Sequence, residues 1–187
     1  ITAIDNVPVF ALQKMDLPQI DEFIDKNSPS QRVSDLIRTK IKMNRKWIKI
    51  VGVPLNLFML INLISLKKAF PDDESKIIYA FILNIYKREK EKHVYFKTSY
   101  FHELITYLAF KAIENYNNTN SGLSLKEVES YLKERDSRIG LFEVISFLQK
   151  SIELNLITKD LSLYSFTHQS FQETLAADYL RKKSNAL

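Results

Sequence analysis

The stretch Phe166-Thr-His-Gln-Ser-Phe-Gln-Glu-Thr-Leu-Ala-Ala-Asp-Tyr-Leu180 contains the pattern that decides the fold of the second half of this chain. Ser170 and Glu173 have the spacing of a capping box, in which each side chain bonds the other residue's amide at a helix start. Apolar side chains then recur every four residues, at Phe171, Leu175 and Tyr179. His168 precedes this predicted helix, beside the positive end where anions are stabilised. Spacing alone leaves two roles open for His168: a phosphate contact, or a polar residue that closes a β-hairpin before a core helix.

The composition favours a mainly helical protein. The chain has 187 residues with only 3 Gly and 5 Pro, which is few for a fold rich in tight turns. Its 27 basic and 22 acidic side chains are scattered and give a mild net charge of +5. The absence of cysteine excludes disulfides and cysteine-metal sites, and it fits a reducing compartment. Because the chain begins at Ile1 rather than Met, we expect a piece of a longer protein.

The most apolar run, residues 51–66, indicates a buried helix. It contains Asn56, Asn62 and Ser65, and it is shorter than the roughly 20 residues of a membrane-spanning helix. We therefore expect a soluble, cytoplasmic protein that has no membrane partner.

Helical periodicity recurs along the rest of the chain. In the first half, a short strand is predicted at residues 7–12, and helices are predicted to start near Asp16, Ser30, Pro54 and Glu74. Asp16 and Gln19 have the spacing of another capping box. In the second half, helices are predicted over residues 100–116, after a capping box of Ser124 and Glu127, and over residues 141–152.

Two short strands are predicted before the last helix, at residues 155–158 and 163–167, with a turn near Lys159-Asp160. Three helices, a two-stranded wing and a final helix describe a winged-helix domain. The predicted fold is therefore mainly α: a helical bundle domain followed by a winged-helix domain with a small β-hairpin wing.

The pattern Phe-x-His-x-Ser-Phe-Gln-Glu-x-Leu-Ala-Ala-x-Tyr-Leu resembles the winged-helix segment of NACHT-type signalling NTPases. These proteins belong to the STAND class, together with the animal NOD-like receptors and their bacterial relatives. The resemblance implies that His168 contacts the phosphates of bound ADP and helps to hold the closed, inactive state.

A second segment, Gly52-Val-Pro54, resembles the Gly-x-Pro element of the helical domain in the same family, whose proline packs against adenine. The resemblance implies a cofactor-binding set of His168, Pro54 and Gly52 for ADP or ATP. It also implies a domain order in which residues 1–12 end the nucleotide-binding core, residues 13–92 form the helical domain and residues 93–187 form the winged-helix domain.

The nucleotide-hydrolysing half of such an enzyme is missing from this sequence. There is no Gly-x-x-x-x-Gly-Lys-Ser/Thr phosphate loop and no acidic strand end that could hold magnesium. We expect no catalytic or metal-binding residues here, an inactive chain by itself, and Mg²⁺ only in a parent NTPase. The resemblance implies that the partners are the chain's own nucleotide-binding core and, on activation, further copies of the protein, in a signalling role such as defence.

A nucleic-acid-binding winged helix is the alternative function. Its recognition helix would cover residues 141–150, which carry only Glu143 and Lys150 as charged side chains, a poor set for phosphate contacts. Nucleic acid is therefore not the expected partner. The other two histidines, His93 and His102, are predicted to face solvent.

Overall fold

The computed structural model describes residues 13–66, 69–93, 97–115 and 122–185. Helices dominate these residues, and a small antiparallel sheet of three strands completes them. The strand predicted at residues 7–12 lies outside the described part. The chain divides into two compact units between Ile77 and Ile78. The domain division at residues 92 and 93 stays a prediction.

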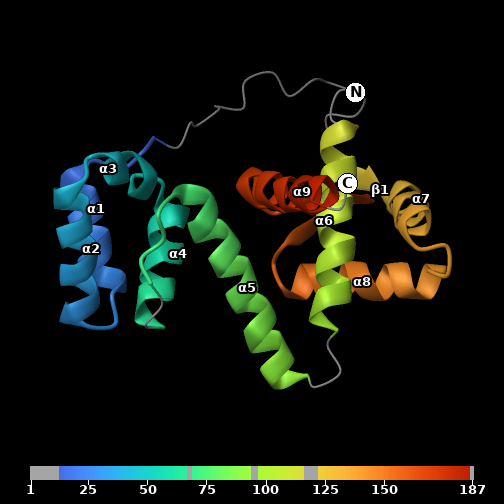
Figure 1. Ribbon diagram of the computed structural model, residues 1–187, viewed down its shortest axis with the longest axis horizontal. Helices are drawn as coiled ribbons and strands as arrows, with labels where there is room; N and C mark the ends of the chain where they lie inside the picture. Colours follow the sequence, from blue (N-terminus) through green and yellow to red (C-terminus); the bar gives the residue numbers. More distant parts are fainter. Residues whose placement is uncertain (1–12, 67–68, 94–96, 116–121, 186–187) are drawn as a thin grey trace, which may run out of the picture. The chain divides into compact units, whose positions relative to one another are not determined.

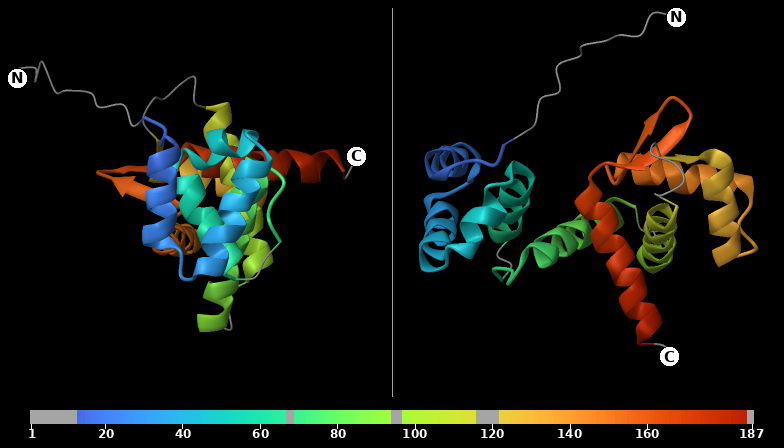
Figure 2. Two further views of the ribbon diagram at one scale, coloured as in Figure 1. Left: turned by 90° about the vertical axis from the view of Figure 1, so that its left-hand side faces the viewer. Right: turned by 90° about the horizontal axis from the view of Figure 1, so that it is seen from above.

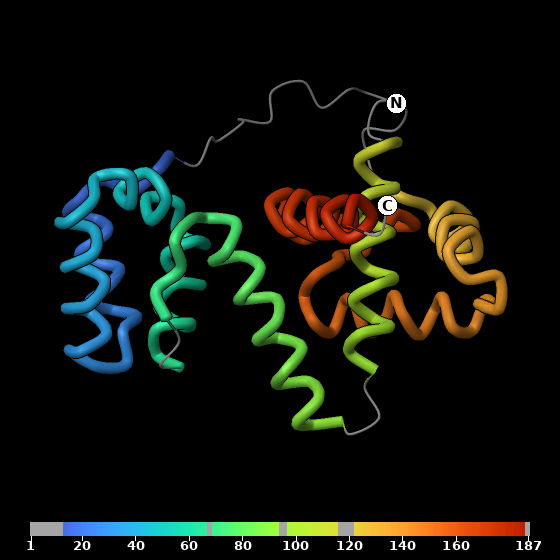
Figure 3. Tube along the Cα trace, in the orientation of Figure 1, coloured from blue at the N-terminus to red at the C-terminus, as the bar shows by residue number. Residues whose placement is uncertain are grey.

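The first unit is all-helical. Its elements are α1 (Leu17–Asn27), α2 (Gln31–Met43), α3 (Lys46–Val51), α4 (Pro54–Ser65) and the first residues of α5 (Glu74–Lys92). Figure 3 shows α1 and α2 as a pair of neighbouring helices joined by a short loop. The apolar run predicted as a buried helix is α4, in which Leu57, Leu60 and Leu63 are fully buried.

The second unit contains the rest of α5 and everything after it. Its elements are α6 (Thr98–Glu114), β1 (Leu123–Ser124), α7 (Leu125–Arg135), α8 (Leu141–Glu153), β2 (Ile157–Asp160), β3 (Leu163–Phe166) and α9 (Gln169–Ser184). The most extensive helix packing in this unit is between α6 and α9, which cross each other in Figure 1.

The sheet has the strand order β1-β3-β2. The predicted hairpin is present, with Ile157 opposite Phe166 and Asp160 opposite Leu163. In the right-hand view of Figure 2 it is the projecting orange loop. Its turn comes after Asp160, two residues later than predicted, and Leu161 takes a left-handed φ of 51° in it. The two-residue strand β1 was not predicted, because a strand this short has no readable periodicity.

Two of the three predicted capping boxes are confirmed, at the starts of α1 and α7. The Gln19 amide donates to Asp16 Oδ1 at 2.9 Å, and the Asp16 amide donates to Gln19 Oε1 at 3.0 Å. At α7, the Ser124 amide donates to Glu127 at 2.8 Å and the Glu127 amide donates to the Ser124 hydroxyl at 3.3 Å. In the described part of the chain, no helix is both long and apolar enough to cross a membrane.

Candidate functional site

The N-terminal end of α9 differs from the predicted capping box. The helix begins at Gln169, so His168 is the N-cap residue, with an extended backbone (φ −138°, ψ 135°), and no side chain caps the helix. Ser170 is already the second helical residue, so the predicted capping role of Ser170 is wrong. The carboxylate of Glu173 instead accepts a hydrogen bond from Gln169 Nε2 at 2.7 Å.

The position of the helix start follows from the hairpin. The amide of Thr167 donates to the Leu156 carbonyl at 3.0 Å, which extends the strand pairing of β2 and β3 by one contact. Only His168 then remains between the sheet and α9, because the next residue, Gln169, is already helical. The N-cap position therefore falls to a histidine, which leaves the first-turn amides without a side-chain acceptor.

Packing orients the imidazole of His168. The half-buried ring meets Phe171 edge to face, with ring centroids 5.2 Å apart, and Phe171 in turn stacks on Phe81 at 6.5 Å. Among the described residues, His168 has no side-chain hydrogen-bond partner, and the buried hydroxyl of Thr167 also has none. The imidazole of His168 and the hydroxyl of Thr167 thus both have unused hydrogen-bonding capacity, and both residues lie at the positively polarised N-terminal end of α9.

The other two predicted site residues lie together in the first unit, whereas His168 belongs to the second. Pro54 is exposed at the first position of α4, where its missing amide costs nothing. Gly52 is buried at the end of α3, and its carbonyl accepts the Met15 amide at 2.7 Å. A Cβ at Gly52 would lie 3.0 Å from the Ile48 carbonyl oxygen. The space at Gly52 is therefore tight, and a side chain there would make the neighbouring backbone shift by a few tenths of an ångström.

A second histidine site was missed by the sequence reasoning. His102, predicted to face solvent, is buried in α6, so that prediction is wrong. Its Nε2 lies 2.8 Å from Asp178 Oδ2 in α9, and its Nδ1 lies 3.4 Å from the Tyr86 hydroxyl in α5. The available signal was Asp178 itself, which falls seven residues after Phe171 and therefore on the apolar face of α9.

The charges around this cluster are balanced by two cations. Arg181 and Lys182 contact the Asp178 carboxylate at 2.6 and 2.9 Å. Burial acts to raise the pKa of Asp178, but the hydrogen bonds from Arg181, Lys182 and His102 outweigh it and lower the pKa to about 2. Burial lowers the pKa of His102, and the bond to Asp178 only partly opposes this shift. Burial likewise raises the pKa of Tyr86.

The His102 cluster can hold α5, α6 and α9 together, and its groups have no open face for a substrate. The third histidine, His93, is exposed as predicted and lies 3.4 Å from Glu89. No group of three or more His, Asp and Glu side chains in the described ranges could hold a metal ion.

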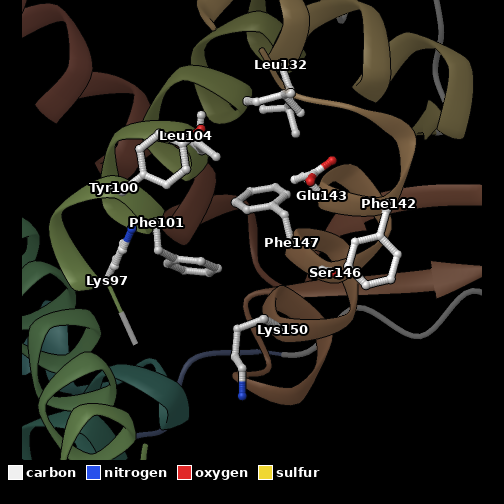
Figure 4. A pocket seen from close by; sticks show the side chains of 11 residues that line it. Lys97, Tyr100, Phe101, Leu104, Leu132, Phe142, Glu143, Ser146, Phe147 and Lys150 are labelled. Atoms are coloured by element: carbon white, nitrogen blue, oxygen red, sulfur yellow. The ribbon is translucent and has the colours of Figure 1, made fainter. Parts of the chain in front are cut away.

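A groove of about 350 Å³ lies between α6 and α8 in the second unit (Figure 4). Its walls are mainly apolar and include Phe101, Leu104 and Phe147. The outward side of α8 is also apolar, with four exposed large side chains: Leu141, Phe142, Ile145 and Ile152. Lys150 is the one cationic residue of α8, so this helix offers few contacts for the phosphates of a nucleic acid.

Three comparisons with known proteins gave no match: no protein-family model fits the chain, and no curated protein or solved structure matches it significantly.

Proposed function

We propose that this chain is the regulatory helical and winged-helix part of a nucleotide-switched signalling NTPase of the NACHT type. The observation that carries the proposal is the N-terminal end of α9. There the sequence resemblance and the local chemistry select the same residue, His168, at a helix end that no side chain caps. The hydroxyl of Thr167 beside it also has no hydrogen-bond partner among the described residues, but it is buried and is not part of the proposed phosphate contact.

The arrangement of the second unit supports the winged-helix part of the proposal. Helix, short strand, two helices and a hairpin follow one another as α6, β1, α7, α8, β2 and β3, and β1 pairs with the second strand of the hairpin. A winged helix has this order of elements. The hairpin then ends directly at His168, so the wing would position the histidine.

In this proposal the nucleotide-binding core is supplied by the parent protein. Bound ADP would contact His168 with its phosphates and Pro54 with its adenine, while Gly52 allows the close packing before α4. Loss of these contacts on exchange for ATP would favour an open state that self-associates. The switch acts in the cytoplasm with no membrane partner, and Mg²⁺ and hydrolysis belong to the core.

The test is His168→Ala in the full-length parent protein. Removing the phosphate contact should shift the population toward the open state, so the purified variant should retain less ADP and oligomerise more without stimulus. His93→Ala provides the matched control, because His93 is an exposed histidine of the same unit. Unchanged ADP retention together with unchanged basal oligomerisation in His168→Ala would remove the basis of the proposal.

A further inference from the structure

The helix α8 carries exposed apolar side chains next to the face that packs into the core. Its inner side packs Val144, Phe147 and Leu148 into the core, while its outer side leaves Phe142 78% exposed. Leu141, Phe142, Ile145 and Ile152 are four exposed large apolar side chains on this one helix, and apolar side chains gathered in this way on a surface mark an interaction site. The outer side of α8 therefore calls for a covering surface.

A projecting ring and a groove lie next to each other on this surface. Phe142 stands at the edge of the groove between α6 and α8, and Figure 4 shows Phe101 and Phe147 between the two sides of that groove. Because the projecting ring and the groove belong to one patch, two copies related by a two-fold axis can each place the ring of Phe142 at the groove of the other. Such self-complementarity is the property of a two-fold symmetric interface.

The charges on the two sides of the groove are also complementary to each other. Figure 4 shows Lys97 on the α6 side and Glu143 on the α8 side. Lys97 has no ion-pair partner among the described residues, and the carboxylate of Glu143 accepts from the Gly140 amide at 3.0 Å. A two-fold axis through the groove exchanges its sides, so Lys97 of each copy would face Glu143 of the other.

We infer that α8 and the groove beside it form a self-association surface, in which Phe142 of each copy enters the groove of a second copy. The inference does not rest on the proposed nucleotide switch. The association is non-covalent, because the chain contains no cysteine. The interface is isologous, so it closes at a dimer.

The first experiment is sedimentation velocity of the purified chain over a wide concentration range. The mass should rise from 21.9 kDa toward twice that value as the concentration increases. Phe142→Glu should stay monomeric, because it places a charge in the partner's apolar groove. Leu161→Glu is the matched control, since Leu161 is 92% exposed in the hairpin turn and should associate like the unchanged chain. Both variants should keep the far-ultraviolet circular dichroism spectrum of the unchanged chain.

The second experiment exchanges the charges. Lys97→Glu and Glu143→Lys should each weaken self-association by about tenfold, since two like-charge contacts replace two attractive ones. An equimolar mixture of these two variants should associate as strongly as the unchanged chain, because each mixed pair regains two opposite-charge contacts. A chain that is monomeric at every concentration, a dimer that survives Phe142→Glu, or a mixture no stronger than its components would each overturn the inference.

Discussion

Two histidines contact α9, and they differ in how much of their hydrogen-bonding capacity is used within the chain. His168, at the start of the helix, is held by the ring of Phe171 and has no side-chain hydrogen bond among the described residues. His102, against the middle of the helix, lies close to Asp178 through one ring nitrogen and to Tyr86 through the other. The first histidine retains bonding capacity for a ligand, whereas the second has used its capacity to join three helices. The contrast agrees with the recognition role proposed for His168 and with a stabilising role for His102.

The largest effect should come from removing the carboxylate at the middle of the helix. Asp178→Ala leaves His102 buried without its acceptor and deprives Arg181 and Lys182 of their counter-charge. We expect the free energy of unfolding of the second unit to fall by about 3 kcal/mol. Urea denaturation followed by circular dichroism measures this change.

The matched control for this variant is Asp160→Ala, because Asp160 is exposed at the end of β2. Its effect should stay within about 0.5 kcal/mol, as for most surface substitutions. If the two variants lost similar amounts of stability, the buried pair would not hold the helices, and the two histidine sites would not differ as described.

The two histidine sites also differ in whether they could be predicted from the sequence. The helices of the second unit and the hairpin follow from local periodicity, and the boxes at Asp16 and Ser124 follow from residues three apart. The start of α9 could not be read locally, because it depends on the bond between Thr167 and Leu156 across the hairpin. His102 could not be read at all from its neighbours, since its partner Asp178 lies 76 residues away. His168 was selected because its signal, a long motif, is continuous in sequence.

The pH dependence of stability should carry the signature of the buried site. Burial lowers the pKa of His102 below its ordinary value of 6.5, so the folded state binds this proton less readily than the unfolded state. The stabilisation is therefore fully present above pH 6.5 and is lost as the pH falls through the folded pKa. Asp178 adds a second loss at lower pH, as the pH falls from 3.8 toward about 2.

Urea midpoints at pH 8, 6.5 and 5 measure the first of these losses. His102→Gln should flatten the dependence in this range, whereas the control His93→Gln should leave it unchanged. A slope that persists in His102→Gln would assign the titration to another group and weaken the contrast between the two histidines.

A smaller effect is expected at the third member of the buried cluster. Tyr86→Phe removes a hydroxyl that lies 3.4 Å from His102 Nδ1, a long distance for a hydrogen bond, and keeps the ring packed against Phe101. We expect a loss of about 1 kcal/mol or less in the free energy of unfolding. Tyr164→Phe, in the half-exposed part of β3, is the control and should have no measurable effect. A loss as large as that of Asp178→Ala would mean that the tyrosine hydroxyl, and not the carboxylate, anchors His102.

The smallest effect on stability should come from His168→Ala, and its smallness distinguishes the two roles that the sequence left open. A histidine that closes the hairpin would stabilise the folded chain, so its removal would lower the free energy of unfolding at least as much as Tyr86→Phe. A histidine that binds a phosphate contributes only its edge-to-face contact with Phe171 while the ligand is absent, so the change should be about 0.5 kcal/mol. The same urea titration of the isolated chain decides between them, because no nucleotide-binding loop is present in it to bind ADP. Near-unchanged stability here, combined with lost ADP retention in the parent protein, would assign His168 to recognition, since a structural defect would alter both measurements.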